Sequence, residues 1–348
     1  MDRIRVGIVG LGANTRLRHV PGLRACTDVQ ITGVCNRSSE STSAAAREYD
    51  VPKTYSRWEE LVADPDIDAV VIGTWPYLHC AITLAALDAG KHVLTEARMA
   101  MNAAEARQML QASQSHSGIV TQIVPSPFGL RAGLLVKELV AEGFLGELRE
   151  VVVLGTNNSV ADSNSPLHWR QATEYSGQNM LVLGILHETL IRWAADPVRV
   201  LSQTHVFTPR RIDPAKNELA DVGTPDAVRV LTELPCGARG LYHLSGVMHH
   251  GPGIQIHLYG SDGTIKYHFT PEDRLFAARK DDKELTEISV PSDKAGHWRV
   301  EEEFINSIRG EEKVELTDFA TGVRYMEFTE SVARSAESGQ WVELSSDS

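Results

Sequence analysis

The feature that most restricts the fold of this chain is an alternation of short apolar segments with helical segments over residues 1–124. The predicted strands are Ile4–Val9, Val29–Cys35, Asp68–Ile72, His92–Thr95 and Ile119–Val124. The predicted helices are Leu17–Cys26, Glu40–Tyr49, Trp58–Ala63, Tyr77–Asp88 and Ala103–Ser117, the last with Asn102 as N-cap. Because strands separated by helices imply βαβ units, the pattern predicts an α/β domain with a parallel sheet.

A change of pattern at Pro125-Ser126-Pro127 predicts a domain junction, since two prolines in three residues interrupt a strand. Strand-like segments dominate beyond it, at 148–155, 199–206, 227–233, 239–245, 253–259 and 264–269. Several are joined by glycine-bearing turns, which favours antiparallel pairing. Helices at 128–142, 179–193, 298–309 and 318–335 are expected as well, the last three covering one face of the sheet. The predicted domains are therefore 1–124, and 125–348 as an α+β domain with one large, mainly antiparallel sheet.

Composition excludes some classes of partner. The chain has 348 residues, with 34 Lys and Arg against 46 Asp and Glu, a formal charge of −12. This balance argues against nucleic acid or an anionic membrane as a main partner. The four cysteines are scattered, and no apolar run approaches the roughly 20 residues that span a bilayer. With no signal-peptide pattern at the N-terminus, we expect a soluble cytoplasmic protein with reduced thiols.

Gly10-Leu11-Gly12 directly follows the first predicted strand and precedes a helix. Glycines there permit a tight turn through which backbone N–H groups approach a pyrophosphate. The third position of this fingerprint is altered, because Thr15 stands where glycine or alanine is usual. G-x-G alone also fits an ordinary turn, but its place after the first strand of a βαβ series favours a dinucleotide site.

The end of the second predicted strand bears on the choice of cofactor. An acidic residue there would bind the ribose hydroxyls of NAD, whereas a nearby arginine accommodates the 2′-phosphate of NADP. The chain has Asn36, Arg37 and Ser38 at this point. The absence of a repelling charge and the presence of Arg37 favour NADP over NAD, unless Arg37 is only a solvated loop residue.

With these features the chain resembles the Gfo/Idh/MocA family, which includes glucose–fructose oxidoreductase and inositol dehydrogenase. The matching segments are 10–12 with 19–21, 74–76 with His79, 86–93, 169–170, 176–177 leading to His187, 260–263, and the closing helix with Ser335 and Gly339. The resemblance implies a Rossmann domain followed by an α/β domain whose open sheet supports a dimer or tetramer. It also implies NAD(P)-dependent oxidation or reduction of a sugar, a polyol or a related carbonyl compound.

The candidate cofactor-binding residues follow the glycine turn and the ends of the strands beside it. They are Gly10, Gly12, Ala13, Asn14, Thr15, Asn36, Arg37, Ser38, Thr74, Trp75, Pro76, His79 and Glu96. The chain departs from the family at its catalytic positions. The family's Glu-Lys-Pro is Glu96-Ala97-Arg98 here, the usual aspartate is Leu183, and only His187 survives.

His187 is the candidate acid/base for the hydroxyl proton that accompanies hydride transfer, although a buried core histidine fits the same position. His168 and Tyr175 are further catalytic candidates, and Arg98, Trp169 and Arg170 are candidate substrate-binding residues. Tyr175 also fits a packing role, and Arg98 also fits exposure to solvent or a pair with Glu96. The pair at 249–250 lacks partners at ligand spacing, so no metal site is predicted.

Three functions fit these residues. The first is an active NAD(P)-dependent oxidoreductase of a sugar-like substrate. The second is a glycosidase-like or lyase-like relative that oxidises a sugar carbon transiently and regenerates its cofactor. The third is a nucleotide-binding sensor or regulator without turnover, which the loss of two catalytic groups would suit.

Overall fold

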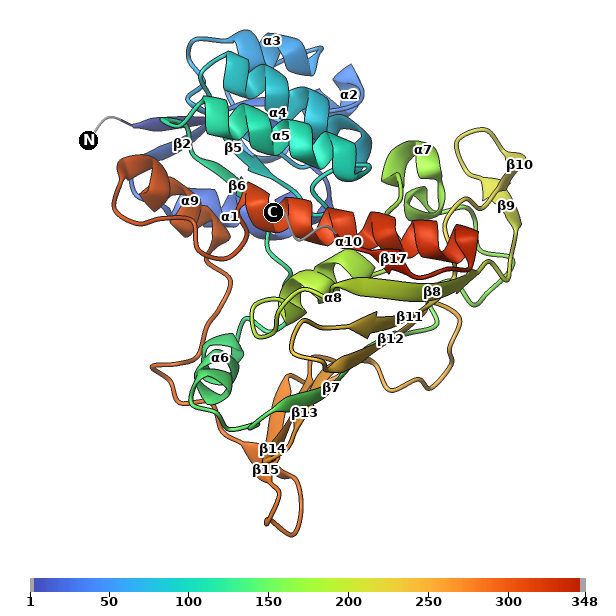
Figure 1. Ribbon diagram of the computed structural model, residues 1–348. Helices are drawn as coiled ribbons and strands as arrows, with labels where there is room; N and C mark the ends of the chain where they lie inside the picture. Colours follow the sequence, from blue (N-terminus) through green and yellow to red (C-terminus); the bar gives the residue numbers. More distant parts are fainter. Residues whose placement is uncertain (1–2, 345–348) are drawn as a thin grey trace. The chain divides into compact units, whose positions relative to one another are not determined.

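The computed structural model describes residues 3–344, which form two compact units. Unit 1 comprises residues up to Pro125 together with Arg299–Met326, and unit 2 comprises Ser126–Trp298 and the segment from Glu327 onward (Figure 1). Among the described helices, none is long and apolar enough to cross a membrane. The predicted fold class, a parallel Rossmann-type domain plus a domain with a large mainly antiparallel sheet, is confirmed.

Unit 1 contains a six-stranded parallel sheet with the order β3-β2-β1-β4-β5-β6. Its strands are β1 (Ile4–Val9), β2 (Val29–Cys35), β3 (Lys53–Thr54), β4 (Ala69–Ile72), β5 (His92–Thr95) and β6 (Thr121–Ile123). Its helices are α1 (Val20–Ala25), α2 (Ser39–Glu48), α3 (Trp58–Ala63), α4 (His79–Asp88) and α5 (Ala103–Ser115). A π-helical turn, Thr15–His19, precedes α1, and a 3₁₀ turn, Pro76–Leu78, precedes α4.

Local chemistry explains where these elements begin. The side chain of Asn102 accepts a hydrogen bond from the Glu105 N–H at 2.9 Å, so the predicted N-cap of α5 is confirmed. Ser38 caps α2 in the same way by accepting from the Ser41 N–H. Strands β1 and β4 read as nearly continuous apolar runs because both faces of a parallel sheet are covered by helices.

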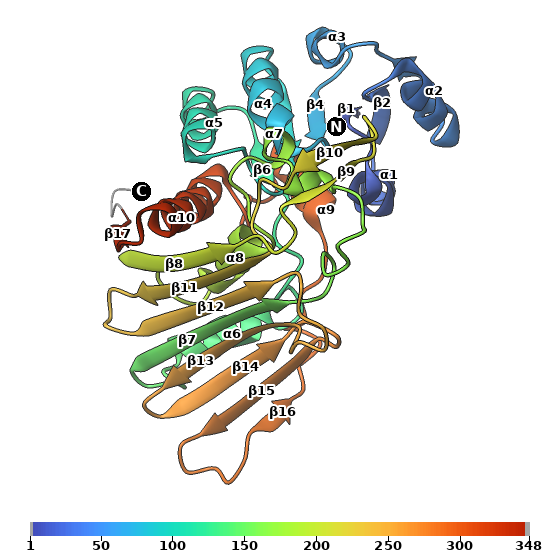
Figure 2. The same ribbon diagram turned by 90° about the vertical axis from the view of Figure 1, so that its right-hand side faces the viewer.

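A late segment of the chain returns to unit 1. Helix α9 (Val300–Arg309) packs beside α1, and α10 (Phe319–Ser338) begins in this unit (Figure 2). The Ile123 N–H donates to the Thr317 carbonyl at 3.0 Å, which ties the segment to β6. The expectation that 298–309 covers the sheet of the second domain is therefore wrong. Its apolar side chains are buried in unit 1, so sequence order does not reveal their partner.

Unit 2 is built on a nine-stranded sheet with the order β16-β15-β14-β13-β7-β12-β11-β8-β17. These are β7 (Leu148–Thr156), β8 (Arg199–His205), β11 (Ala227–Glu233), β12 (Arg239–Ser245), β13 (Ile254–Gly260), β14 (Gly263–His268), β15 (Arg274–Arg279), β16 (Thr286–Ile288) and β17 (Val342–Glu343). All neighbouring pairs are antiparallel except β7 with β12, which run parallel.

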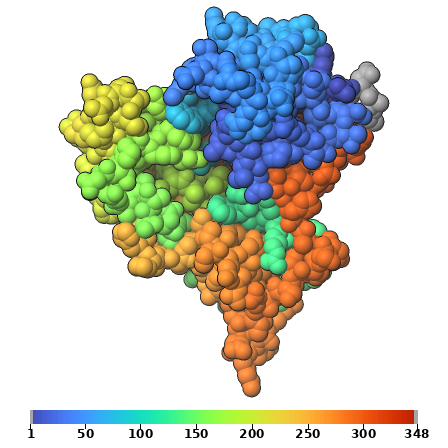
Figure 3. All heavy atoms as spheres, turned by 180° about the vertical axis from the view of Figure 1, so that it is seen from behind, coloured from blue at the N-terminus to red at the C-terminus, as the bar shows by residue number. Residues whose placement is uncertain are grey.

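Helices cover only one face of this sheet, as Figure 2 shows. They are α6 (Gly133–Ala141), α8 (Leu183–Leu190) and the second part of α10, whereas the short α7 (Thr173–Ser176) contributes to a separate small apolar cluster. A separate hairpin, β9 (Arg210–Asp213) with β10 (Glu218–Asp221), lies on the surface and is yellow in Figure 3. The helix at 179–193 is shorter than expected, and β9, β10, β15, β16 and β17 correspond to no predicted element.

Candidate cofactor site and surrounding residues

A pocket of about 540 Å³ lies in unit 1 where β1, β2 and β4 end. Its walls include the glycine turn, residues 35–37 and residues 73–75. The strand order reverses at this point, because β2 and β3 extend from one side of β1 whereas β4 to β6 extend from the other. Such a switch point at the carboxyl ends of the strands is where open parallel sheets bind ligands.

The glycine turn is shaped by close backbone contact. Gly10 has φ of +86°, and a Cβ there would lie 2.7 Å from the Thr74 nitrogen. Gly73 faces it, since a Cβ on Gly73 would lie 2.2 Å from the Gly10 carbonyl oxygen. Thr15, at the altered fingerprint position, is buried, and its hydroxyl donates to the Gly10 carbonyl at 3.1 Å. The threonine therefore closes the turn from within the unit.

The residues at the end of β2 line the same pocket. Asn36 is held in place because its side-chain oxygen accepts the Leu11 N–H at 2.7 Å and its amide donates to the Ser41 carbonyl at 3.1 Å. Arg37 is exposed and lines the pocket with Arg16 and Arg57. Arg16 pairs with Glu48, and Arg57 pairs with Glu59. The end of β2 therefore presents cations without an acidic residue in the strand-end position.

Sequence reasoning missed the contribution of residues 56–59 to this pocket. The two-residue strand β3 pairs with β2, with Gly33 beside Lys53 and Val34 beside Thr54, and this pairing brings Arg57 and Trp58 to the end of β2. A strand of two residues leaves no readable alternation, so the sequence holds no signal for this placement.

The opposite end of the pocket is formed or supported by Thr74, Trp75, Pro76 and His79. Thr74 and Trp75 line the pocket, whereas Pro76 and His79 are buried. The His79 ring lies between backbone carbonyls, with Nδ1 3.0 Å from the Arg98 oxygen and Nε2 3.0 Å from the Thr74 oxygen. Burial lowers the pKa of this imidazole. His79 thus links the turns that follow β4 and β5.

Glu96, at the end of β5, belongs to a polar cluster inside unit 1. Its Oε1 accepts from the Asn14 amide at 2.5 Å and lies 3.0 Å from His19 Nε2, and His19 Nδ1 lies 2.5 Å from Glu301 Oε1. Burial opposes the charged form of His19, but the hydrogen bonds to Glu301 and Glu96 raise its pKa to about 9. Burial likewise opposes ionisation of Glu96, yet His19 holds the pKa of this carboxyl below its usual value.

His19 and Glu301 were not predicted as site residues. His19 belongs to one of the segments that resemble the family, and Glu301 stands 282 positions further along the chain. No spacing in the sequence links them. Ala97 packs against an apolar cluster and supplies no amine, and the alternative that Arg98 points to solvent is wrong because Arg98 is buried.

In unit 2, His187 lies in the core on α8. Its Nδ1 is 2.8 Å from the Tyr242 hydroxyl, its Nε2 is 3.0 Å from Asp196 Oδ1, and its ring stacks on Phe328 with centroids 3.7 Å apart. The side chain is fully buried. Both ring nitrogens are therefore occupied within the unit, which favours a structural role. The predicted acid/base role of His187 stays a prediction.

The other candidates of unit 2 lie on a segment near α7. The exposed His168 accepts the Arg170 N–H at 3.2 Å through its Nδ1, and the Arg170 guanidinium lies 4.3 Å from the centre of the Trp169 ring. Partial desolvation of the ring and the neighbouring Arg170 charge lower the pKa of His168. Tyr175 is half-buried against a small apolar cluster. Their catalytic and substrate-binding roles stay predictions.

Arg211 supports the loop that precedes these residues, and sequence reasoning did not identify it. The side chain is buried and donates to three loop carbonyls, those of Val160 at 2.7 Å, Asp162 at 2.7 Å and Ser165 at 3.0 Å. From the sequence alone, an arginine on a short hairpin strand would be expected on the surface. Within residues 3–344, no group of three or more His, Cys, Asp or Glu side chains is arranged to hold a metal ion.

Comparison with known proteins gives a consistent picture. Residues 4–123 match the GFO_IDH_MocA model, described as an oxidoreductase family with an NAD-binding Rossmann fold, and residues 134–266 match the GFO/IDH/MocA C-terminal domain. The chain is 30% identical over 248 residues to trans-1,2-dihydrobenzene-1,2-diol dehydrogenase of Mus musculus, covering 70% of this chain and 68% of the relative.

Two further similarities extend this comparison. A 1,5-anhydro-D-fructose reductase of Ensifer adhaerens is 35% identical over 142 residues, which are 41% of this chain and 42% of that protein. Among solved structures, the apo form of levoglucosan dehydrogenase superposes with a TM-score of 0.89 at 21% identity, covering 100% of both chains. At that identity the superposition shows a shared fold.

Proposed function

Because the chain belongs to the GFO/IDH/MocA family of oxidoreductases, we propose that it transfers hydride between NAD(P) and a sugar, polyol or related carbonyl compound. The observation that carries this proposal is the pocket at the switch point of the unit 1 sheet. Its glycine turn leaves backbone room for a pyrophosphate, and cationic side chains lie at its β2 end. In the oxidative direction, an alcohol and NAD(P)⁺ give a carbonyl, NAD(P)H and a proton.

The substrate class rests on the relatives. They are named for a dihydrobenzene diol and for anhydrofructose, which suggests a hydroxyl-bearing or carbonyl-bearing ring for this chain as well. A panel of sugars and polyols, each offered with NAD⁺ and NADP⁺ while nicotinamide absorbance is followed, tests the proposal. Net cofactor reduction by at least one panel member is expected. Release of an aglycone without net cofactor change would point to transient oxidation, and tight nucleotide binding without either reaction would point to a sensor.

NADP is the proposed preferred cofactor. The Arg37 guanidinium and the hydroxyls of Ser38 and Ser41 lie at the end of β2, where a 2′-phosphate is bound in sheets of this type. Asn36 fills the strand-end position without adding a negative charge. Titration of the protein with NAD⁺ and NADP⁺ in parallel tests the preference. At least tenfold tighter binding of NAD⁺ would overturn it.

Substitutions test which side chain exchanges the hydroxyl proton during hydride transfer. If His187 is the acid/base, His187→Gln lowers kcat by about 10²–10⁴-fold. If His187 is structural, the variant loses about 2–4 kcal/mol of unfolding free energy, because it removes a buried stacked ring and its hydrogen bonds. Its kcat per folded molecule then changes little. His168→Gln and Tyr175→Phe are the parallel variants for the remaining candidates.

A homo-oligomer formed through the open face of the nine-stranded sheet is also proposed. Leu231 and Leu241 are direct cross-strand neighbours on that face and are 48% and 40% exposed. Paired leucines exposed on a sheet favour association. Sedimentation of the wild-type chain and of the double variant Leu231→Lys, Leu241→Lys tests this surface, with dissociation to monomers as the expected result.

A further inference from the structure

The polar cluster of Asn14, His19, Glu96 and Glu301 is built to hold one carboxylate in a fixed position. Glu96 Oε1 lies within hydrogen-bond distance of both Asn14 and His19, whereas its Oε2 accepts the Ala97 N–H at 3.3 Å. His19 and Glu301 are buried, and the Glu96 side chain keeps 13% of its surface exposed. Of the three ionisable side chains in the cluster, Glu96 is therefore the one that reaches the surface of the unit.

The Glu301 carboxylate packs against a glycine that leaves room for it. A Cβ at Gly22, on α1, would lie 2.5 Å from Glu301 Oε2, so a larger residue at that point would displace the carboxylate. Glu301, on α9, is thus a second acidic side chain in contact with His19, which also contacts Glu96. Against the opposing effect of burial, His19 and Glu96 favour each other's charged forms, because hydrogen bonds to Glu301 and Glu96 raise the pKa of His19 to about 9 and His19 lowers the pKa of Glu96.

The register of the sheet places Glu96 relative to the glycine turn. Val9 pairs with Ile72, and Ile72 pairs with Thr95, so Gly10, Gly73 and Glu96 leave their strands at the same level. The pocket at the β2 end suits the adenosine half of a dinucleotide. A dinucleotide bound across the switch point then extends its other half toward β4 and β5. Glu96 stands at that end.

We propose that the carboxylate of Glu96, positioned by His19 and Glu301, makes this site discriminate between the two redox forms of its nicotinamide cofactor in favour of the oxidised form. The inference rests on the proposed function. The oxidised nicotinamide ring carries a positive charge and the reduced ring is neutral, while the remainder of the dinucleotide is the same in both. A fixed negative charge at this end therefore acts on one form only. Glu96 is a specificity-determining residue, and Glu301 is a positioning residue.

Calorimetric titrations with NADP⁺ and NADPH, and with NAD⁺ and NADH, test the proposal in the full-length wild-type protein and in Glu96→Gln. The substitution removes one charge and keeps the shape of the side chain. We expect the ratio of Kd for the oxidised form to Kd for the reduced form to rise about tenfold, with most of the change in the oxidised form.

Glu301→Gln and Glu303→Gln make a matched pair on α9. Both glutamates are equally buried, but Glu303 contacts Gln122 and the Glu315 N–H and not the cluster. We expect Glu301→Gln to raise the same ratio by about twofold to threefold, because its charge lies behind His19. Glu303→Gln should leave the ratio unchanged. NMR titration of the His19 ring supplies a second readout, with its pKa falling in Glu96→Gln and staying the same in Glu303→Gln.

Two other outcomes have separate meanings. If Glu96→Gln weakens both redox forms equally, the cluster only ties α9 to the sheet, and the proposal is overturned while cofactor binding stands. If wild-type protein binds neither form, the proposed function itself fails.

Discussion

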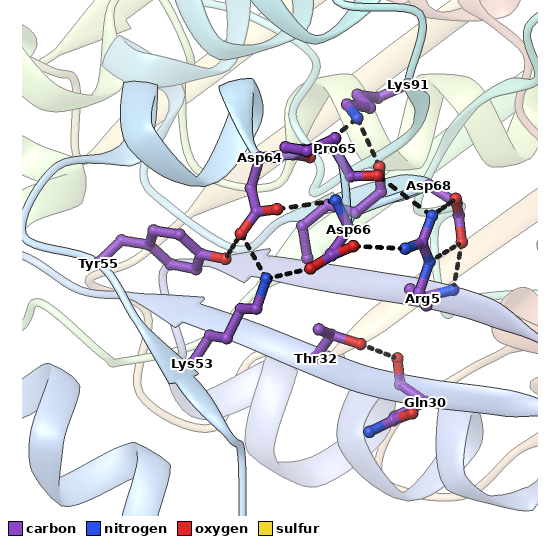
Figure 4. Close-up of polar contacts among 11 residues, drawn as sticks. Arg5, Gln30, Thr32, Lys53, Tyr55, Asp64, Pro65, Asp66, Asp68 and Lys91 are labelled. Carbon is purple, nitrogen blue, oxygen red and sulfur yellow. Dashed lines mark hydrogen bonds and ion pairs between the residues drawn. The ribbon is translucent and has the colours of Figure 1, made fainter.

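The two edges of the unit 1 sheet carry polar side chains of different kinds. At the amino-terminal edge, shown in Figure 4, charged groups are paired with one another. Arg5 contacts Asp68 at 2.7 Å, and Lys53 contacts Asp64 at 2.8 Å and Asp66 at 2.7 Å. Lys91 donates to the backbone carbonyl of Ile67 at 2.6 Å. At the carboxyl edge the chain instead forms a pocket lined by arginines and a glycine turn.

From this difference we infer that the amino edge of the sheet contributes to stability and the carboxyl edge to ligand binding. The charged side chains named at the amino edge are paired with one another or with backbone carbonyls. At the carboxyl edge, backbone N–H groups and the exposed Arg37 can bind an anion, although Arg16 and Arg57 are paired with glutamates there too. Substitutions at the amino edge should therefore change stability with little effect on cofactor affinity. Substitutions at the carboxyl edge should change affinity, and where the backbone itself is strained they should change stability as well.

The largest effect is expected from Gly10→Ala at the carboxyl edge. The new Cβ would meet the Thr74 backbone at a residue whose φ is +86°, so both unfolding free energy and cofactor binding should fall. We expect a loss of about 2–4 kcal/mol in stability, measured by urea unfolding, and no detectable cofactor binding by calorimetry. Gly12→Ala is the control, because its Cβ would make only an ordinary contact of 3.5 Å. Equal stability losses in the two variants would contradict the assignment of strain to Gly10.

Asp64→Asn tests the amino edge. Hydrogen bonds from Lys53 and Tyr55 hold the pKa of Asp64 well below its usual value, so the carboxylate stabilises the fold above the unfolded pKa of about 4 and loses this contribution as pH falls. The variant should be less stable than wild type by about 1–3 kcal/mol at pH 7. The difference in unfolding free energy between wild type and variant should narrow at pH 3. Thermal unfolding at both pH values measures it, and a gap that grows on acidification would refute this account. Cofactor Kd should be unchanged.

A smaller effect is expected from Arg37→Ala. Removing one exposed guanidinium should weaken NADP⁺ binding by about tenfold, which corresponds to about 1.4 kcal/mol, and leave NAD⁺ binding within twofold. Parallel titrations with the two nucleotides give the comparison. Arg24→Ala serves as the matched control, because Arg24 does not line the pocket. Equal losses for both nucleotides would mean that Arg37 does not contact the 2′-phosphate.

The sequence predicts the elements of unit 1 well where local signals are strong. Strands β1, β2 and β5 begin and end at the predicted residues, and Asn102 caps α5 as expected. These features depend on apolar runs and short-range hydrogen bonds. The two-residue β3 and the parallel pairing of β7 with β12 depend on contacts between distant segments, which no local pattern records.

The candidate site divides in the same way. The glycine turn and the strand ends were predictable because βαβ units place them at one edge. Glu301 could not be found, since its partner His19 lies on another part of the chain and only folding joins them. His187 shows the opposite difficulty. In the sequence, a polar residue on an apolar helix resembles a catalytic group, but in the fold its ring contacts Tyr242, Asp196 and Phe328.

Hydrogen exchange of the wild-type protein with and without saturating NADP⁺ tests the contrast between the two edges most directly. Cofactor binding at the carboxyl edge should slow exchange in residues 10–16, 36–41 and 73–78. Exchange in residues 53–55 and 64–68 at the amino edge should change little. Protection confined to the amino edge, or protection absent from the glycine turn, would contradict the account.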